Sequence, residues 1–125
     1  MISGDQIVAH LVGDYLLQSH WMATQKTRSS FAAAAHAVAY TLPFALLTSS
    51  VVCLAAIFAS HFVLDRWRIA RFVVWFKNGA RGPVTATGYA DDVPPWLAVW
   101  LFVAADNTLH LLCNGVAIAW LGSKP

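Results

Sequence analysis

The stretch SSFAAAAHAVAYTLPFALLTSSVVCLAAIFASHFVL, residues 29–64, contains 36 residues without a single Asp, Glu, Lys or Arg. As one helix it would be about 54 Å long at about 1.5 Å per residue, whereas the hydrocarbon core of a bilayer is only about 30 Å thick. The stretch must therefore fold back on itself, and its polar segment LLTSS, residues 46–50, marks the turn. We expect one helix over residues 30–47 and a second over residues 51–76.

The composition of the whole chain has the same apolar character. Of its 125 residues 58% are hydrophobic and 11% are charged, whereas charged residues make up about a quarter of a typical soluble domain. This length suits one domain with about four spanning helices of about 20 residues each. The predicted fold class is all-α, a polytopic membrane four-helix bundle formed by a single domain over residues 1–125. The net charge of +2 does not indicate a nucleic-acid partner.

Two further helices complete the expected bundle, over residues 6–25 and 95–121. Between the third and fourth helices, residues 77–93 are charged, contain glycine and proline and lack apolar periodicity, so they form a long loop. The first helix carries a polar stripe and inserts only if partners cover it; the alternative is that it lies in the membrane interface. No removable signal peptide is expected, because the N-terminal stretch lacks a basic region and a cleavage site.

The distribution of basic residues predicts the orientation, because Lys and Arg concentrate on the cytoplasmic side of short loops. Seven of the eight basic residues fall on the side of loops 26–29 and 77–93, and only Lys124 lies opposite. We therefore expect both loops in the cytoplasm, in a bacterial inner membrane, with membrane lipids as the neighbours of the helices.

Ionisable residues recur at a spacing of four within these apolar helices. Three pairs of one histidine and one aspartate each share a helix face, and the second helix adds a fourth histidine. Counted along the helices, the four histidines, Asp14 and Asp106 lie about 10 to 20 Å from the expected cytoplasmic ends, and ionisable groups at such depth normally face one another or a wet cavity. We expect seven side chains to converge: His10 and Asp14, His36, His61 and Asp65, and Asp106 and His110.

Neutral imidazole and carboxylate are ligands that suit zinc, manganese or iron, and helical bundles build metal sites from such side chains on facing helices. The sequence therefore predicts a divalent metal site, with zinc as the first choice. Three or four histidines would bind the ion, and the carboxylates would bridge or orient the imidazoles. The alternative is that the pairs hydrogen-bond across helices and fix the packing without a metal. His20, beside Trp21, is expected to be an interfacial residue.

Four segments resemble a known family: HLVGDYLLQSHWMATQK, AAHAVAYTLPF, SHFVLDRWRIAR and ADNTLHLLCNGVAIAWL. Their order H-x3-D, H, H-x3-D, D-x3-H extends over nearly the whole chain. The sequence resembles the domain-of-unknown-function family 3307, which are small integral membrane proteins of bacteria and their phages. The resemblance implies a fold of membrane helices and implies no activity.

In architecture and ligand type the chain also resembles membrane-bound metal-dependent hydrolases, whose transmembrane His and Asp residues hold zinc and activate water. This resemblance implies that Asp14 or Asp106 acts as general base on a lipid or lipid-linked substrate, with Arg66 or Arg68 holding an anionic headgroup. The alternative is a non-enzymatic phage or bacterial membrane protein that conducts ions or protons, as a homo-oligomer, or binds a partner. Few polar residues continue toward the far side of the bundle, which favours a one-sided site.

Overall fold

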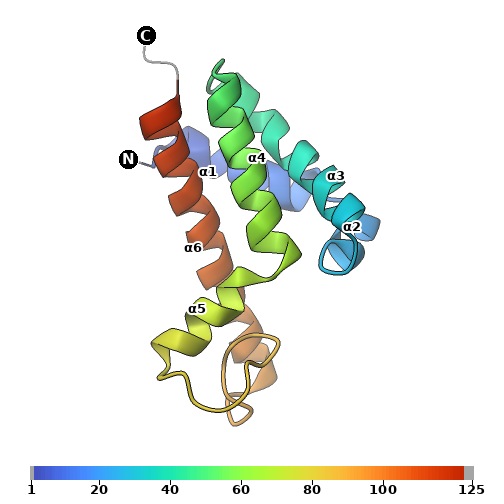
Figure 1. Ribbon diagram of the computed structural model, residues 1–125, viewed down its shortest axis with the longest axis vertical. Helices are drawn as coiled ribbons and strands as arrows, with labels where there is room; N and C mark the ends of the chain where they lie inside the picture. The colour runs from blue at the N-terminus through green and yellow to red at the C-terminus, as the bar shows by residue number, and fades with distance from the viewer. Residues whose placement is uncertain (1, 123–125) are drawn as a thin grey trace.

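The computed structural model describes residues 2–122 (Figure 1), which form helices and loops without a β-strand. The all-α prediction is therefore confirmed. In chain order the elements are α1 (Gly4–Leu11), the π-helical turn η1 (Val12–Leu16), α2 (His20–Gln25), α3 (Ser30–Thr41), the 3-10 turn η2 (Leu42–Leu46), α4 (Val51–Arg66), α5 (Ile69–Lys77) and α6 (Pro95–Leu121).

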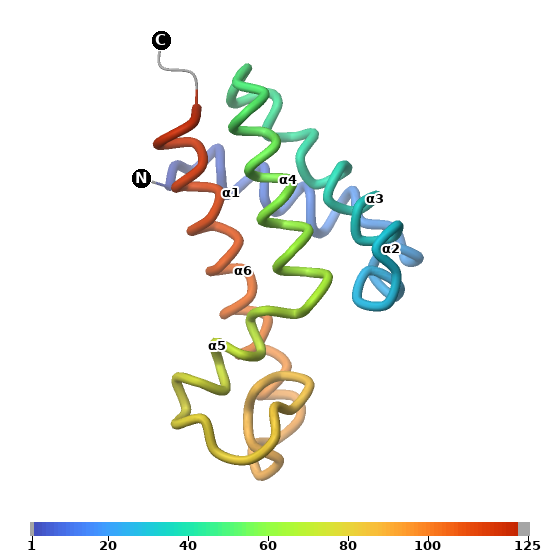
Figure 2. The backbone as a smooth tube through the Cα atoms, in the orientation of Figure 1, coloured from blue at the N-terminus to red at the C-terminus, as the bar shows by residue number. Residues whose placement is uncertain are grey.

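Helix α4 lies between α3 and α6 and packs against both. The backbone trace in Figure 2 shows that α4 runs antiparallel to its two neighbours, because the chain reverses after η2 at the end where α6 finishes. The segment α1–η1 crosses behind these helices, so that α1 contacts α6 and η1 contacts α3. Helix α5 packs against α6 at the opposite end. Side chains from α1, η1, α3, α4 and α6 can therefore meet at one place.

The interior of the bundle is unusually polar and its exterior is unusually apolar. Beside apolar residues such as Phe44 and Ile57, the fully buried positions include four histidines. Several of the largest apolar side chains instead point outward. Each of the following is at least 75% exposed: Leu16, Phe31, Leu46, Val51, Phe76 and Trp120.

Three of the expected helices are not continuous α-helices in the structure. The expected helix over residues 30–47 is α-helical to Thr41 and continues as the 3-10 turn η2. The expected helix over residues 6–25 consists of α1, η1 and α2, and α2 starts anew because the Ser19 side chain caps it by accepting a hydrogen bond from the Met22 backbone N–H. The expected helix over residues 51–76 is divided into α4 and α5 at Arg68, whose φ of 50° lies in the left-handed region. Helix α6 has the expected bounds of residues 95–121.

Within residues 2–122, one helix is long and apolar enough to cross a membrane by length and composition, namely α6. Only 11% of its most apolar window is buried. The segment Ser30–Leu46 is apolar but shorter. The core helix of a soluble protein passes the same test of length and composition, so the membrane part of the expected four-helix bundle stays a prediction.

Candidate metal centre

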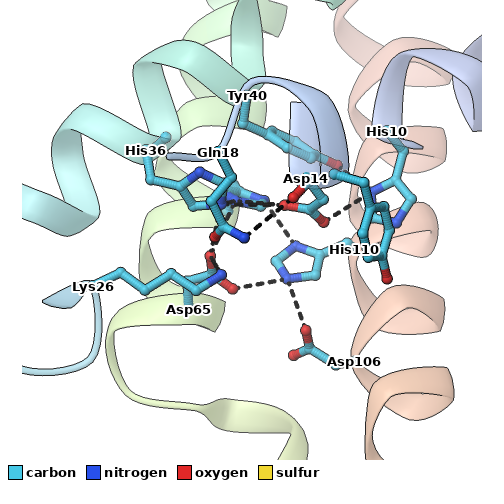
Figure 3. A network of polar contacts seen from close by, with 12 residues as sticks. His10, Asp14, Gln18, Lys26, His36, Tyr40, Asp65, Asp106 and His110 are labelled. Atoms are coloured by element: carbon cyan, nitrogen blue, oxygen red, sulfur yellow. Dashed lines mark hydrogen bonds and ion pairs between the residues drawn. The ribbon is translucent and has the colours of Figure 1, made fainter. Parts of the chain in front are cut away.

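Four side chains from three elements bring one ligand atom each to the same place inside the bundle (Figure 3). All four residues are at least 92% buried, and their ligand atoms lie within 4.8 Å of one another. This set is called the inner group below. It consists of Asp14 from η1, His36 from α3, and His61 and Asp65 from α4.

The spacing within the inner group is that of ligands around a small metal ion. His36 Nε2 lies 3.2 Å from Asp14 Oδ1, 3.1 Å from Asp65 Oδ2 and 2.9 Å from His61 Nε2. His61 Nε2 lies 3.5 Å and 3.2 Å from the same two oxygens. Ligands about 2.0 Å from a tetrahedral zinc ion are about 3.3 Å from one another. A single imidazole N–H cannot donate to three neighbours at once, whereas one ion in their midst contacts all four ligand atoms.

Asp65 also belongs to a second set of ligand atoms, called the outer group, which it forms with Asp106 and His110 of α6. Asp65 Oδ1 lies 3.3 Å from His110 Nε2, which in turn lies 3.6 Å from Asp106 Oδ2. Among the described residues His110 Nε2 is buried without a hydrogen-bond partner. The nitrogen therefore makes ion-pair contacts with two carboxylates without a well-oriented hydrogen bond, and a bound cation would give all three groups a common partner.

The π-helical turn η1 sets the position of Asp14. A Cβ atom added at Gly13 would lie 2.7 Å from Tyr40 Cδ2 and 3.0 Å from the Tyr40 backbone. Glycine at this position therefore allows η1 to lie directly on α3. Gln18 holds the same turn by donating a hydrogen bond of 3.2 Å to the Asp14 backbone carbonyl. Because π-helical turns in α-helices occur frequently at functional sites, this local geometry agrees with a role for Asp14 in ligand binding.

His10 lies beside the cluster but belongs to neither group of converging ligand atoms. Its Nε2 is 3.1 Å from Asn107 Oδ1, which can only accept, so Nε2 donates and Nδ1 accepts from the Tyr40 hydroxyl at 2.8 Å. The Tyr40 hydroxyl also accepts a hydrogen bond of 2.6 Å from Asn114 Nδ2. Tyr40 stacks on the His61 ring with centroids 3.5 Å apart. His10 thus holds Tyr40 through Nδ1 and Asn107 through Nε2, and Tyr40 in turn packs against an inner-group ligand.

A cavity of about 100 Å³ opens onto the outer group. Its lining includes Asp65, Asp106, Lys26 and Arg68. The Asp106 side chain is 23% exposed, whereas that of Asp65 is 4% exposed. At about 30 Å³ per water molecule the cavity has room for about three waters. It therefore admits a metal ion, water or a small anionic group, and it does not admit a whole lipid.

The two arginines considered for an anionic headgroup have different surroundings. Arg66 donates to the backbone carbonyls of Thr27 at 2.6 Å and Arg28 at 3.5 Å, and so ties the end of α4 to the loop before α3. Arg68 lines the cavity with its guanidinium 4.7 Å from the Phe102 ring. Its Nε is buried without a hydrogen-bond partner in the described part of the chain. Arg68 is therefore the arginine placed to meet a ligand in the cavity.

The sequence pattern missed two residues that complete the site. Lys26 contributed to the expected topology only, yet its Nζ donates to Asp65 Oδ2 at 2.7 Å. The two residues are 39 positions apart, so no periodic signal relates them. Asn107 follows Asp106 in sequence and has no helical spacing that marks it, although it fixes the tautomer of His10. His20 is exposed on α2, away from both groups.

Fold and site together define an all-helical protein with a buried cluster of histidines and aspartates that can hold a metal ion. The family described as "Protein of unknown function (DUF3307)" matches residues 4–120, so the chain belongs to this family and the resemblance seen in the sequence is confirmed. No curated protein and no solved structure matches the chain. The chemistry must therefore be argued from the site itself.

Proposed function

We propose that this chain is a membrane-embedded, metal-dependent hydrolase that acts on a lipid or lipid-linked substrate. The observation that carries the proposal is the inner group, in which the Nε2 atoms of His36 and His61 lie 2.9 Å apart and each lies 3.1–3.5 Å from the Asp14 and Asp65 oxygens. Two imidazoles and two carboxylates suit zinc first, and manganese or iron second.

The distribution of side chains supports the membrane setting. In a bilayer the outward-facing apolar residues contact lipid, while the ionisable residues face one another inside the bundle. Helix α6 has this character, since it is 27 residues long and almost unburied over its apolar window. With loops 26–29 and 77–93 in the cytoplasm, the cavity with Lys26 and Arg68 opens toward the cytoplasmic leaflet of a bacterial inner membrane.

The residues around the cavity fit the steps of hydrolysis. A divalent ion held by these residues with one position open to water would lower the pKa of that water to about 7 and polarise a carbonyl or phosphoryl oxygen. Of the two carboxylates considered as general base, Asp106 reaches the cavity and Asp14 is buried in the inner group. We therefore assign to Asp106 the acceptance of a proton from water, and to Arg68 the binding of an anionic headgroup. The acyl chains of the substrate would remain outside the cavity, in the bilayer.

The metal content of the purified protein tests the proposal. Membranes are washed with alkaline carbonate, the protein is extracted in detergent, and its metals are measured by elemental analysis. We expect the protein to remain in the washed membranes and to contain near-stoichiometric zinc, manganese or iron. His36→Ala and His61→Ala should lose the metal while keeping their helical circular dichroism. The matched control His20→Ala changes an exposed histidine and should retain it.

Each part of the proposal has its own contrary result. If the wild-type protein contains no metal and its melting temperature does not rise when metal is added, the cluster serves only to form hydrogen bonds between helices. Release of the protein by carbonate would contradict the membrane setting. Metal-loaded protein that hydrolyses neither phospholipids nor lipid-linked phosphates in an Asp106-dependent manner would contradict the enzymatic part.

A further inference from the structure

Asp65 joins the two groups through its two carboxylate oxygens. Oδ2 faces His36 and His61 in the inner group at 3.1 Å and 3.2 Å, and Oδ1 faces His110 in the outer group at 3.3 Å. An ion bound in either group would therefore have Asp65 as one of its ligands. The inner and outer groups are neighbouring positions on one carboxylate.

The hydrogen bond between His61 and His110 limits how many ions these positions hold. Their Nδ1 atoms are 3.0 Å apart, and a hydrogen bond between two ring nitrogens contains one proton. The ring that donates this proton has a bare Nε2, whereas the neutral ring that accepts it carries its own proton on Nε2. His61 Nε2 belongs to the inner group and His110 Nε2 to the outer group. The neutral pair therefore offers a metal ligand to one group at a time.

The charge of the cluster also favours a single bound ion. Asp14, Asp65 and Asp106 carry three negative charges when ionised, whereas Lys26, at 2.7 Å from Asp65, and Arg68, in the cavity lining, carry two positive charges. One divalent ion brings the sum to +1. Two divalent ions would bring it to +3 in a mostly buried site, which is strongly unfavourable.

The two groups also differ in access. The inner group supplies four protein ligands, all of them buried, which is the pattern of closed metal sites. The outer group supplies three, and one of these, Asp106, is 23% exposed and lines the cavity. A position with three protein ligands and an opening is the pattern of sites where the metal exchanges its remaining ligand.

We propose that the cluster holds a single divalent ion that occupies the two groups in turn, entering and leaving through the outer group. This inference rests on the proposed metal site and adds a second position and a route to it. Asp65 binds the ion in both positions, by Oδ1 in the outer group and by Oδ2 in the inner group. As the ion moves outward, the Nδ1 proton of His61 passes to His110, and the Nε2 proton of His110 passes by way of Asp65 to His61 Nε2.

Cobalt(II) tests this inference, because its visible absorption reports the ligands of a bound ion. Metal-free protein in detergent is titrated with Co²⁺, association is followed by stopped flow, and dissociation is followed after adding excess chelator. We expect one Co²⁺ per wild-type chain. In Asp106→Asn we expect one Co²⁺ with the same absorption bands, because the inner ligands are intact. Both rates should fall by roughly tenfold or more, with a much smaller change in their ratio.

Matched variants separate the exchange route from a general effect of the substitution. Asp106→Glu keeps a carboxylate at the cavity and should restore most of the exchange rate. Asp92→Asn removes an exposed carboxylate from the loop before α6 and should exchange as the wild type does. His36→Gln removes an inner ligand and should change the absorption bands.

Three results would overturn the inference. Two Co²⁺ ions per wild-type chain would show simultaneous occupancy. Faster dissociation from Asp106→Asn with unchanged association would make Asp106 an ordinary permanent ligand, and unchanged rates in this variant would place the route elsewhere. Wild-type protein that binds no Co²⁺ would also remove the metal site of the proposed function, and this result is distinct from the other three.

Discussion

At the scale of single residues, Asp65 is the side chain on which the cluster depends. It lies within 3.3 Å of three histidines and forms an ion pair with Lys26. A carboxylate that is 4% exposed requires compensation of its charge, and without a metal the ammonium of Lys26 is the nearest full positive charge. The same ammonium repels a divalent ion that approaches Asp65.

Lys26→Met should therefore destabilise the metal-free protein and strengthen its binding of metal. Loss of the partner of a buried carboxylate destabilises the metal-free protein by about 3 kcal/mol, which lowers its melting temperature. Removal of the repulsion strengthens metal binding, so the rise in melting temperature on adding zinc becomes larger than in the wild type. Thermal unfolding with and without a chelator measures both effects. Lys77→Met, at an exposed lysine, is the control, and an equal zinc-induced rise in all three proteins would contradict this role of Lys26.

The sequence was informative about residues wherever helical periodicity relates them. A spacing of four places His61 and Asp65 on one face of α4, and the structure brings their ligand atoms together. Helical spacing could not predict that His10 forms hydrogen bonds with Asn107 and Tyr40, because these contacts join different helices. The pairing of Lys26 with Asp65 depends on tertiary structure in the same way.

At the scale of elements, the turn η1 converts a polar stripe into a ligand position. The sequence predicted one continuous helix over residues 6–25, and helical spacing alone gives no reason for a π-helical turn at Val12–Leu16. The close contact of Gly13 with Tyr40 supplies the physical reason, because any side chain there would separate η1 from α3. Asp14 then reaches His36 across the interface between the two elements.

Gly13→Ala should separate η1 from α3 and weaken the metal site together with the fold. The new Cβ would lie 2.7 Å from a Tyr40 ring carbon, and overpacking of this kind destabilises by about 1–3 kcal/mol. We expect a lower melting temperature and a loss of metal affinity. Gly4→Ala is the control, since a Cβ there meets nothing within 4 Å. Gly13→Ala protein with wild-type metal affinity would show that η1 does not set the position of Asp14.

At the scale of the whole molecule, hydrophobicity and charge were sufficient to predict an all-helical chain, and the helix 95–121 is present as α6. The interruption at Arg68 was not predictable, because it depends on a left-handed backbone conformation held by tertiary contacts, including a hydrogen bond to the Ala86 carbonyl. The convergence of polar side chains on one interior place follows from the matched depth of the pairs. Its division into two groups that share Asp65 follows only from the structure.

The central claim is that the inner group binds a metal ion through two imidazoles and two carboxylates. X-ray absorption at the zinc K edge of the zinc-loaded protein tests this ligand set most directly. The proposed site predicts a shell of nitrogen and oxygen atoms at about 2.0–2.1 Å, with the outer-shell scattering of two imidazole rings. One imidazole should be lost in His36→Gln. A spectrum with sulfur at about 2.3 Å, or one without imidazole scattering, would contradict the claim.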